Sequence, residues 1–220
     1  MAASSGRSYF SSSSCLYSFL VSGSYMLEIL NWIAALLALG TSIGLLLSRD
    51  WRWGLAILAA QYLSMFWLVN YHWPASLAAV KLVTGWMVCA ALGATLRGST
   101  QRPASETAWP EGRLFRLLAA GLVALTTFAL AQRTATWLSI NLAVAWGSLL
   151  LVGMGLLHLG VTARPLRVIL GLLTLLAGFE ILYAAVESSV LVAALLSIIN
   201  LCLALAGAYL LNAPTLEESA

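Results

Sequence analysis

Charge and proline are scarce in this chain, and the shortage of charge excludes an ordinary soluble domain. Only 9% of its 220 residues are charged and 61% are hydrophobic, whereas a soluble domain carries roughly 25% charged residues. The composition therefore predicts an integral membrane protein that has the lipid bilayer as its first partner. Short strands of alternating hydrophobicity are missing as well, so the expected spans are helical.

Patterns for metal binding and catalysis are equally few. The three cysteines, Cys15, Cys89 and Cys202, contain no C-x-x-C pair, and His72 and His158 are expected at opposite membrane faces. We therefore expect no disulfide framework, no metal site and no cofactor, and we expect His158 to be an interfacial residue. Neither a G-x-x-x-x-G-K phosphate loop nor a Ser–His–Asp candidate occurs. These absences favour a non-catalytic membrane subunit, and no nucleic acid is expected as a partner.

Seven apolar segments are long enough to cross a bilayer, which takes about 20 residues in a helix. Backbone amides cannot stay unpaired in lipid, so each segment is predicted to be helical. The expected fold class is therefore an all-α polytopic membrane protein with seven transmembrane helices. The predicted spans are 26–47, 54–72, 74–96, 114–131, 136–160, 165–186 and 189–211.

Residues 1–25 are rich in serine and contain one arginine and no acidic residue. Because their apolar stretch is short, they make a poor signal peptide. We expect either a disordered leader or a translation start at Met26. Residues 97–135 are expected to form a cytoplasmic loop plus a linking helix, and residues 213–220 a cytoplasmic tail.

Arginine is divided unequally between the two sides of the predicted topology. The connections after the first, third and fifth spans hold eight arginines, whereas the other side holds only Arg7 and Arg133. The positive-inside rule therefore predicts an outer N-terminus and a cytoplasmic C-terminus, in what we expect to be a bacterial inner membrane. The eight are Arg49, Arg52, Arg97, Arg102, Arg113, Arg116, Arg164 and Arg167.

Four polar residues inside the apolar spans form a pattern that occurs twice. Gln61 precedes Lys81 by 20 residues, and Glu180 precedes Asn200 by 20. A shift of 119 residues places Gln61 and Lys81 on Glu180 and Asn200. A shift of 115 residues places Arg49 and Arg52 on Arg164 and Arg167. This similarity predicts two parallel three-helix repeats joined by one helix, a 3+1+3 arrangement.

The three-helix repeats are expected at residues 26–96 and 136–212, and the single lysine lies in the first. A bare charge in hydrocarbon costs roughly 2.5–3.5 kcal/mol, so Lys81 and Glu180 are expected to face protein. Each lies about 10 Å below the outer boundary, towards which Glu187 continues the polar stripe of Glu180. Equal depth would allow the two charges to pair. Such a pair is either structural or part of a proton route.

Two stretches carry a resemblance to a known family: residues 75–85, Ala-Ser-Leu-Ala-Ala-Val-Lys-Leu-Val-Thr-Gly, and residues 178–183, Gly-Phe-Glu-Ile-Leu-Tyr. They resemble the third and second helices of the small K subunit of proton-pumping NADH–quinone oxidoreductases. Relatives of that subunit occur in membrane-bound hydrogenases and Mrp-type antiporters. In that family an arginine-bearing turn joins the first two helices, and glutamates lie within the second and third. A two-copy chain is most similar to the larger hydrogenase-type E components.

The resemblance implies an integral subunit of a complex-I-like or hydrogenase-like assembly, packed beside larger antiporter-like subunits. It places Glu180 at the second-helix glutamate of one copy and Lys81 at the third-helix glutamate of the other. Glu180 would then take and release a proton beside the Lys81 cation, while Gln61 and Asn200 would hold bridging water and Glu187 would lie towards the outside. Only one of the four positions keeps the carboxylate, which departs from the family pattern.

Two other classes of protein fit a 3+1+3 arrangement. Small solute facilitators line a central site with parallel repeats, but they usually carry proline kinks inside the helices. Here Pro74 and Pro165 are the first residues of two predicted spans, and no proline lies further inside any span. A non-transporting scaffold subunit is the remaining alternative.

Overall fold

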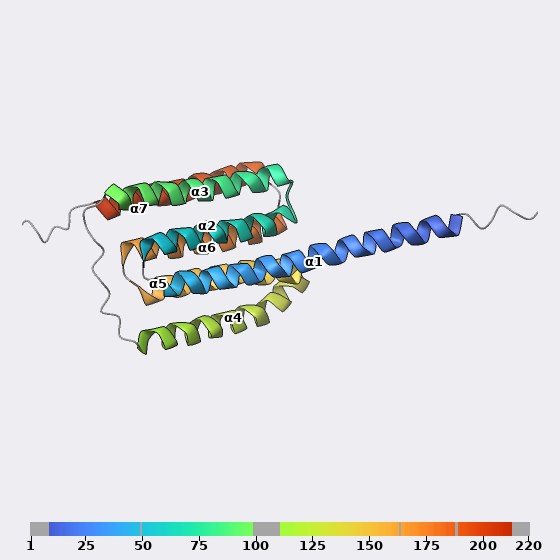
Figure 1. Cartoon of the computed structure of the whole chain (residues 1–220), viewed down its shortest axis with the longest axis horizontal. Helices are drawn as coiled ribbons and strands as arrows, with labels where there is room; N and C mark the ends of the chain where they lie inside the picture. Colours follow the sequence, from blue (N-terminus) through green and yellow to red (C-terminus); the bar gives the residue numbers. More distant parts are fainter. Residues whose placement is uncertain (1–8, 49, 99–110, 163, 188, 213–220) are drawn as a thin grey trace, which may run out of the picture.

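The computed structural model of the protein describes residues 9–48, 50–98, 111–162, 164–187 and 189–212. Within these ranges the chain forms seven helices and no strand (Figure 1). The helices are α1 (Tyr9–Leu47), α2 (Trp51–Asn70), α3 (Ala75–Gly98), α4 (Glu111–Leu138), α5 (Leu142–Val161), α6 (Pro165–Val186) and α7 (Val190–Asn212).

All seven helices are long and apolar enough to cross a membrane, which confirms the predicted number and type of spans. The expected tail at 213–220, most of the loop before α4, and Arg7, Arg49 and Arg102 lie outside the described residues. The membrane span within α1 is Tyr25–Leu47, close to the prediction.

Two boundaries differ from the prediction. Helix α1 begins at Tyr9, so residues 9–25 continue the helix instead of forming a disordered leader. No proline interrupts this stretch, and a helix that has formed extends at little cost. Helix α4 continues to Leu138 because its last turns contain no helix breaker. The break comes at Ser139, which has a φ of 54°; Asn141 then caps α5 by accepting a hydrogen bond from the Ala143 amide at 2.8 Å.

The helices form two layers with α4 at one edge (Figure 1). Helix α2 packs between α1 and α3 in one layer, and α6 between α5 and α7 in the other. Across the layers α1 packs on α5, α2 on α6 and α3 on α7, while α4 packs on α5 and α1. The amino-terminal part of α1 projects beyond the other helices (Figure 1).

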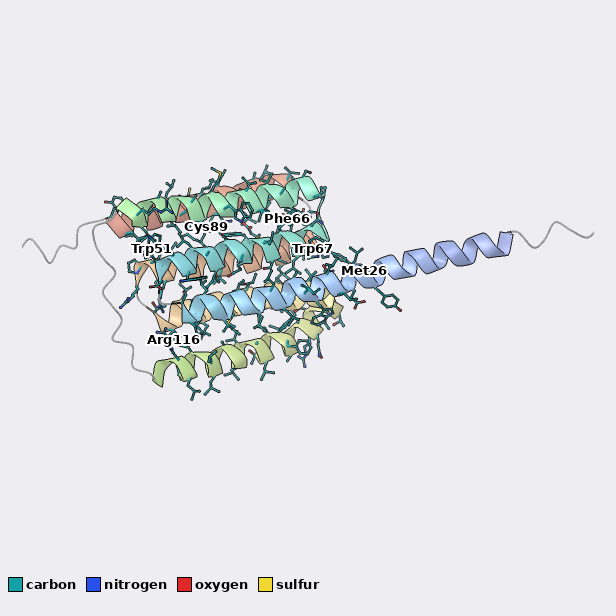
Figure 2. All side chains as sticks on the ribbon, in the orientation of Figure 1. Met26, Trp51, Phe66, Trp67, Cys89 and Arg116 are labelled. Carbon is teal, nitrogen blue, oxygen red and sulfur yellow. The ribbon has the colours of Figure 1, made fainter. Side chains whose placement is uncertain are left out.

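Successive helices run in opposite directions, so α2, α4 and α6 all begin at the same end of the bundle. We call it the arginine end, and the other the opposite end. Figure 2 shows Trp51 at the start of α2 and Arg116 near the start of α4, both at the arginine end. The described arginines of this end are Arg52, Arg97, Arg113, Arg116, Arg164 and Arg167.

Glycine brings α5 and α6 into close contact. A Cβ added at Gly155 of α5 would lie 2.6 Å from the backbone nitrogen of Leu175, and one added at Gly178 of α6 would lie 2.6 Å from the carbonyl oxygen of Ser148. Small residues are what allow membrane helices to approach so closely. The second layer is therefore held by backbone contact as well as by side chains.

Helix α4 lies on the outside of the bundle. Only 11% of its most apolar window is buried, against 61% for α5. Leu114, Leu118, Leu122 and Leu125 are exposed on one side of α4, at spacings of three and four residues. In a membrane-embedded protein this side contacts lipid.

Candidate functional site

A buried ion pair joins the two layers. The Nζ of Lys81 on α3 lies 3.0 Å from Oε1 of Glu180 on α6, and the two side chains are 4% and 2% exposed. Asn200 on α7 donates from Nδ2 to the same oxygen at 2.9 Å. Three helices therefore supply one polar cluster, which we call the Glu180 cluster: Lys81, Glu180 and Asn200.

The neighbouring small residues explain how the three helices come so close. Each member of the Glu180 cluster has small buried residues about one turn away on its own helix, which is the same face. Such faces let helix backbones approach, as membrane interfaces require. The residues are Ala78 and Gly85 on α3, Ala177 and Ala184 on α6, and Ser197 and Ala204 on α7.

Several buried polar atoms of the Glu180 cluster and of α2 have no protein partner among the described residues. Oε2 of Glu180 and Oδ1 of Asn200 are buried and find no hydrogen-bond partner in the described part of the chain. The same holds for both side-chain polar atoms of Gln61 and for the hydroxyl of Tyr62, next to it on α2. The Tyr62 phenol lies close enough to Glu180 to interact with it electrostatically. Its ring covers Gly85, one turn after Lys81, where an added Cβ would overlap the ring.

The predicted polar residues meet only in part. Lys81, Glu180 and Asn200 come together, whereas Gln61 is buried on α2 without a bond to any of them in the described structure. The Asn200 amide bonds the carboxylate directly through Nδ2, and its expected role in holding a bridging water stays a prediction. Glu187 is exposed just after α6, and its backbone carbonyl accepts a hydrogen bond from Trp73 Nε1 at 3.2 Å.

The arginines of the predicted turns lie at the other end of the bundle from the Glu180 cluster. Arg52 is exposed, with its guanidinium 5.4 Å from the centre of the Trp51 ring. Arg164 is exposed and precedes α6. Arg167 donates from Nη2 to the carbonyl of Ser48 at 3.0 Å, just after α1 ends. That bond links the layers at the arginine end, as the Trp73–Glu187 bond does at the opposite end.

Tyr62 and His158 are among the buried polar residues that sequence reasoning missed. His158 is 2% exposed instead of interfacial, because α1 and α6 cover it. Periodicity contained the signal: Leu151 and Gly155 precede His158 by seven and three residues and are both buried on α5. Tyr62 resembled any other aromatic residue of an apolar span, and nothing in the sequence marked it.

The opposite end carries a further histidine. His72 lies in the turn between α2 and α3, with its ring edge-on to Tyr71 at 4.9 Å between centres. Burial lowers the pKa of His72 below its ordinary value, against a smaller effect of a backbone hydrogen bond with Leu68. Among the described residues no group of three or more His, Cys, Asp or Glu side chains is placed to hold a metal ion.

The arrangement suits proton exchange at one atom. Oε1 of Glu180 holds two donors, while Oε2 is left with its lone pairs unused by the described residues. A carboxylate held in this way keeps its orientation when Oε2 gains or loses a proton.

Comparison with protein-family models, with curated proteins and with solved structures finds no match to this chain. The function proposed below therefore rests on the geometry of the Glu180 cluster.

Proposed function

We propose that the chain is an integral subunit of an ion-translocating membrane assembly of the complex-I or hydrogenase kind, in which Glu180 carries the proton. One observation supports this most directly. The Glu180 carboxylate is buried between the two layers. Its Oε1 accepts hydrogen bonds from Lys81 and Asn200, and its Oε2 has no partner among the described residues. Ionisable groups inside a membrane bundle are costly, and they commonly mark such routes.

Lys81 makes the proton affinity of Glu180 depend on charge nearby. With Glu180 ionised, the pair is neutral overall; when Oε2 gains a proton, the Lys81 ammonium is left unbalanced in a poorly solvated place. A further charge approaching the cluster then shifts the balance between the two states. The proton moves between Oε2 and water, and the unpartnered groups of Gln61 and Tyr62 supply hydrogen-bonding positions for that water.

The 3+1+3 repeat belongs to this proposal. Helices α1, α2 and α3 pack on α5, α6 and α7 in the same order, which is what two stacked parallel copies would produce. The arginine end then faces the cytoplasm by the positive-inside rule. The Glu180 cluster would lie in the outer half of a bacterial inner membrane, and larger antiporter-like subunits would pack against the exposed apolar helices.

A non-transporting scaffold is the second candidate, favoured by one observation. Lys81 and Glu180 come from different layers and are bonded to each other, so the pair holds α3 to α6 whether or not protons move. In a scaffold, Glu180 would serve only to bind Lys81 and Asn200. Glu180→Gln would then disturb the assembly of the subunits more than it disturbs proton flux.

Proton flux in vesicles separates these two functions. The chain would be purified in mild detergent with the subunits that accompany it and reconstituted around a pH-sensitive dye. Glu180→Gln should reduce the proton signal by about 100-fold or more while the subunits still co-purify. Glu187→Gln is the matched control, because this exposed carboxylate lies just after the same helix. An unchanged signal in Glu180→Gln would refute the proton-carrying role, and loss of the subunits would support the scaffold.

A further inference from the structure

A second buried polar site lies near the arginine end, between α1, α5 and α6. His158 of α5 is 2% exposed, and Ser42 of α1 is fully buried. The imidazole makes a hydrogen bond with the backbone of Ser42. This leaves Nε2 of His158 and Oγ of Ser42 buried and without a partner in the described ranges. We call these two residues the His158 site.

The packing around the His158 site holds the imidazole in place. A Cβ added at Gly171 of α6 would lie 2.9 Å from Cβ of His158, so the α6 backbone lies directly against it. Among the described residues, the guanidinium groups of Arg167 on α6 and Arg116 on α4 act electrostatically on the ring. The site therefore lies between two cations at the membrane boundary and the apolar interior of the bundle.

An apolar packing role does not account for the unused atoms of this site. Buried polar groups in native proteins almost always have a partner, in the protein or in ordered water. Nε2 and the Ser42 hydroxyl belong to residues in contact through a hydrogen bond. Each of these groups can bind a water molecule: the lone pair of Nε2 accepts a hydrogen bond, and the hydroxyl donates or accepts one.

The His158 site and the Glu180 cluster occupy different halves of the bundle. Gly171 marks the level of His158 on α6, and Glu180 lies about 14 Å further along the same helix. Between them, the buried hydroxyls of Thr174 and Ser148 donate to carbonyls of their own helices, at 2.8 and 2.9 Å. Their oxygens keep lone pairs that accept from water.

We propose that the His158 site binds water and exchanges protons with the arginine-end side, giving the chain a second proton-binding position. A proton from the arginine-end side reaches the bound water, and this water, as hydronium, gives it to the lone pair of Nε2. The ring becomes an imidazolium and neutral water is restored, while the other ring nitrogen keeps its bond to the Ser42 backbone. Loss of the same proton to water restores the neutral ring, so no other bond changes. This inference rests on the proposed proton-carrying function and extends it to the other half of the membrane.

Magnetic resonance of labelled histidine tests the site directly, because the chain has only two histidines. The full chain with isotope-labelled histidine would be placed in lipid bilayers, with His72→Asn so that His158 alone reports. We expect magnetisation transfer from water to Nε2 and a reversible change of its chemical shift with bulk pH. Ser42→Ala should weaken the transfer. A ring without water contact, or one whose shift ignores pH, would overturn the proposal.

The vesicle assay then separates a failure of this inference from a failure of the proposed function. His158→Gln should slow the proton signal by about 100-fold, and His72→Gln, in the turn at the opposite end, should leave it unchanged. A normal rate in His158→Gln beside a lost signal in Glu180→Gln rejects the His158 site and leaves Glu180 in its role. Normal rates in both variants reject the proton-carrying function as well.

Discussion

The first and last three helices each carry two buried polar residues 20 positions apart, yet the two couples bond differently. Asn200 donates to Glu180 at 2.9 Å within the last three helices. Gln61 and Lys81 make no such bond: the lysine reaches across to Glu180 at 3.0 Å, and the Gln61 amide finds no partner among the described residues. Equal spacing along the chain thus does not produce equal contacts.

The carboxylate explains the difference. A charged acceptor binds donors about twice as strongly as a neutral one, and Glu180 is the only buried acid of the described part of the chain. Lys81 and Asn200 therefore converge on it, and nothing comparable draws the neutral amide of Gln61. One acid is enough to organise donors from both layers.

Removing the lysine should have the largest effect on stability. Lys81→Ala leaves the carboxylate buried and unpaired, and losing one partner of a buried pair costs about 3–5 kcal/mol. The free energy of unfolding in detergent or bilayer would be measured for Lys81→Ala, for Glu180→Ala and for the double variant.

The double variant is the control for the Lys81 prediction. Replacing both charges should cost less than Lys81→Ala alone, since no unpaired charge is then left in the interior. If the stability losses of Lys81→Ala and Glu180→Ala add up to the loss in the double variant, the two charges are not coupled. The ion pair then does not stabilise the fold.

The sequence predicts the helices well and the site in part, for different physical reasons. A bilayer demands about 20 apolar residues per helix with every backbone group bonded, so the seven spans follow from the length of the apolar segments. Matching depth also made a Lys81–Glu180 pair reasonable. The isolation of Gln61 and the insertion of Tyr62 depend on the rotation of each helix about its axis. That rotation is set by neighbours such as Gly85, and no local pattern reveals it. The burial of His158 likewise depends on which helices cover the end of α5.

Removing the side-chain amides of Asn200 and Gln61 should affect stability unequally. Asn200→Leu loses a hydrogen bond to a charged acceptor and should destabilise the protein by about 1.5–3 kcal/mol. Gln61→Met keeps the length of the side chain and removes two buried atoms that lack partners in the described structure. It should cost less than Asn200→Leu, because no hydrogen bond to a charged group is lost. Unfolding free energies of the two variants would be compared; an equal loss in both would mean that Gln61 is bonded in the membrane after all.

The smallest expected effect concerns the residue one turn after each couple. Gly85 lies one turn after Lys81 and contacts the Tyr62 ring. In the second unit Ala204 lies one turn after Asn200, and Ile181 is at the position that the predicted repeat gives to an equivalent of Tyr62. Gly85→Ala should therefore cost about 1–3 kcal/mol through overpacking, although the second unit carries that same methyl group. Gly40→Ala is the control, because a Cβ at Gly40 meets nothing within 4 Å. Tyr62→Leu should relieve the effect of Gly85→Ala. If Gly85→Ala lowers stability as much in the Tyr62→Leu background, the backbone of α3 requires glycine at this position and the aromatic ring does not. The two units then differ in helix packing, and Tyr62 is not the cause of the difference.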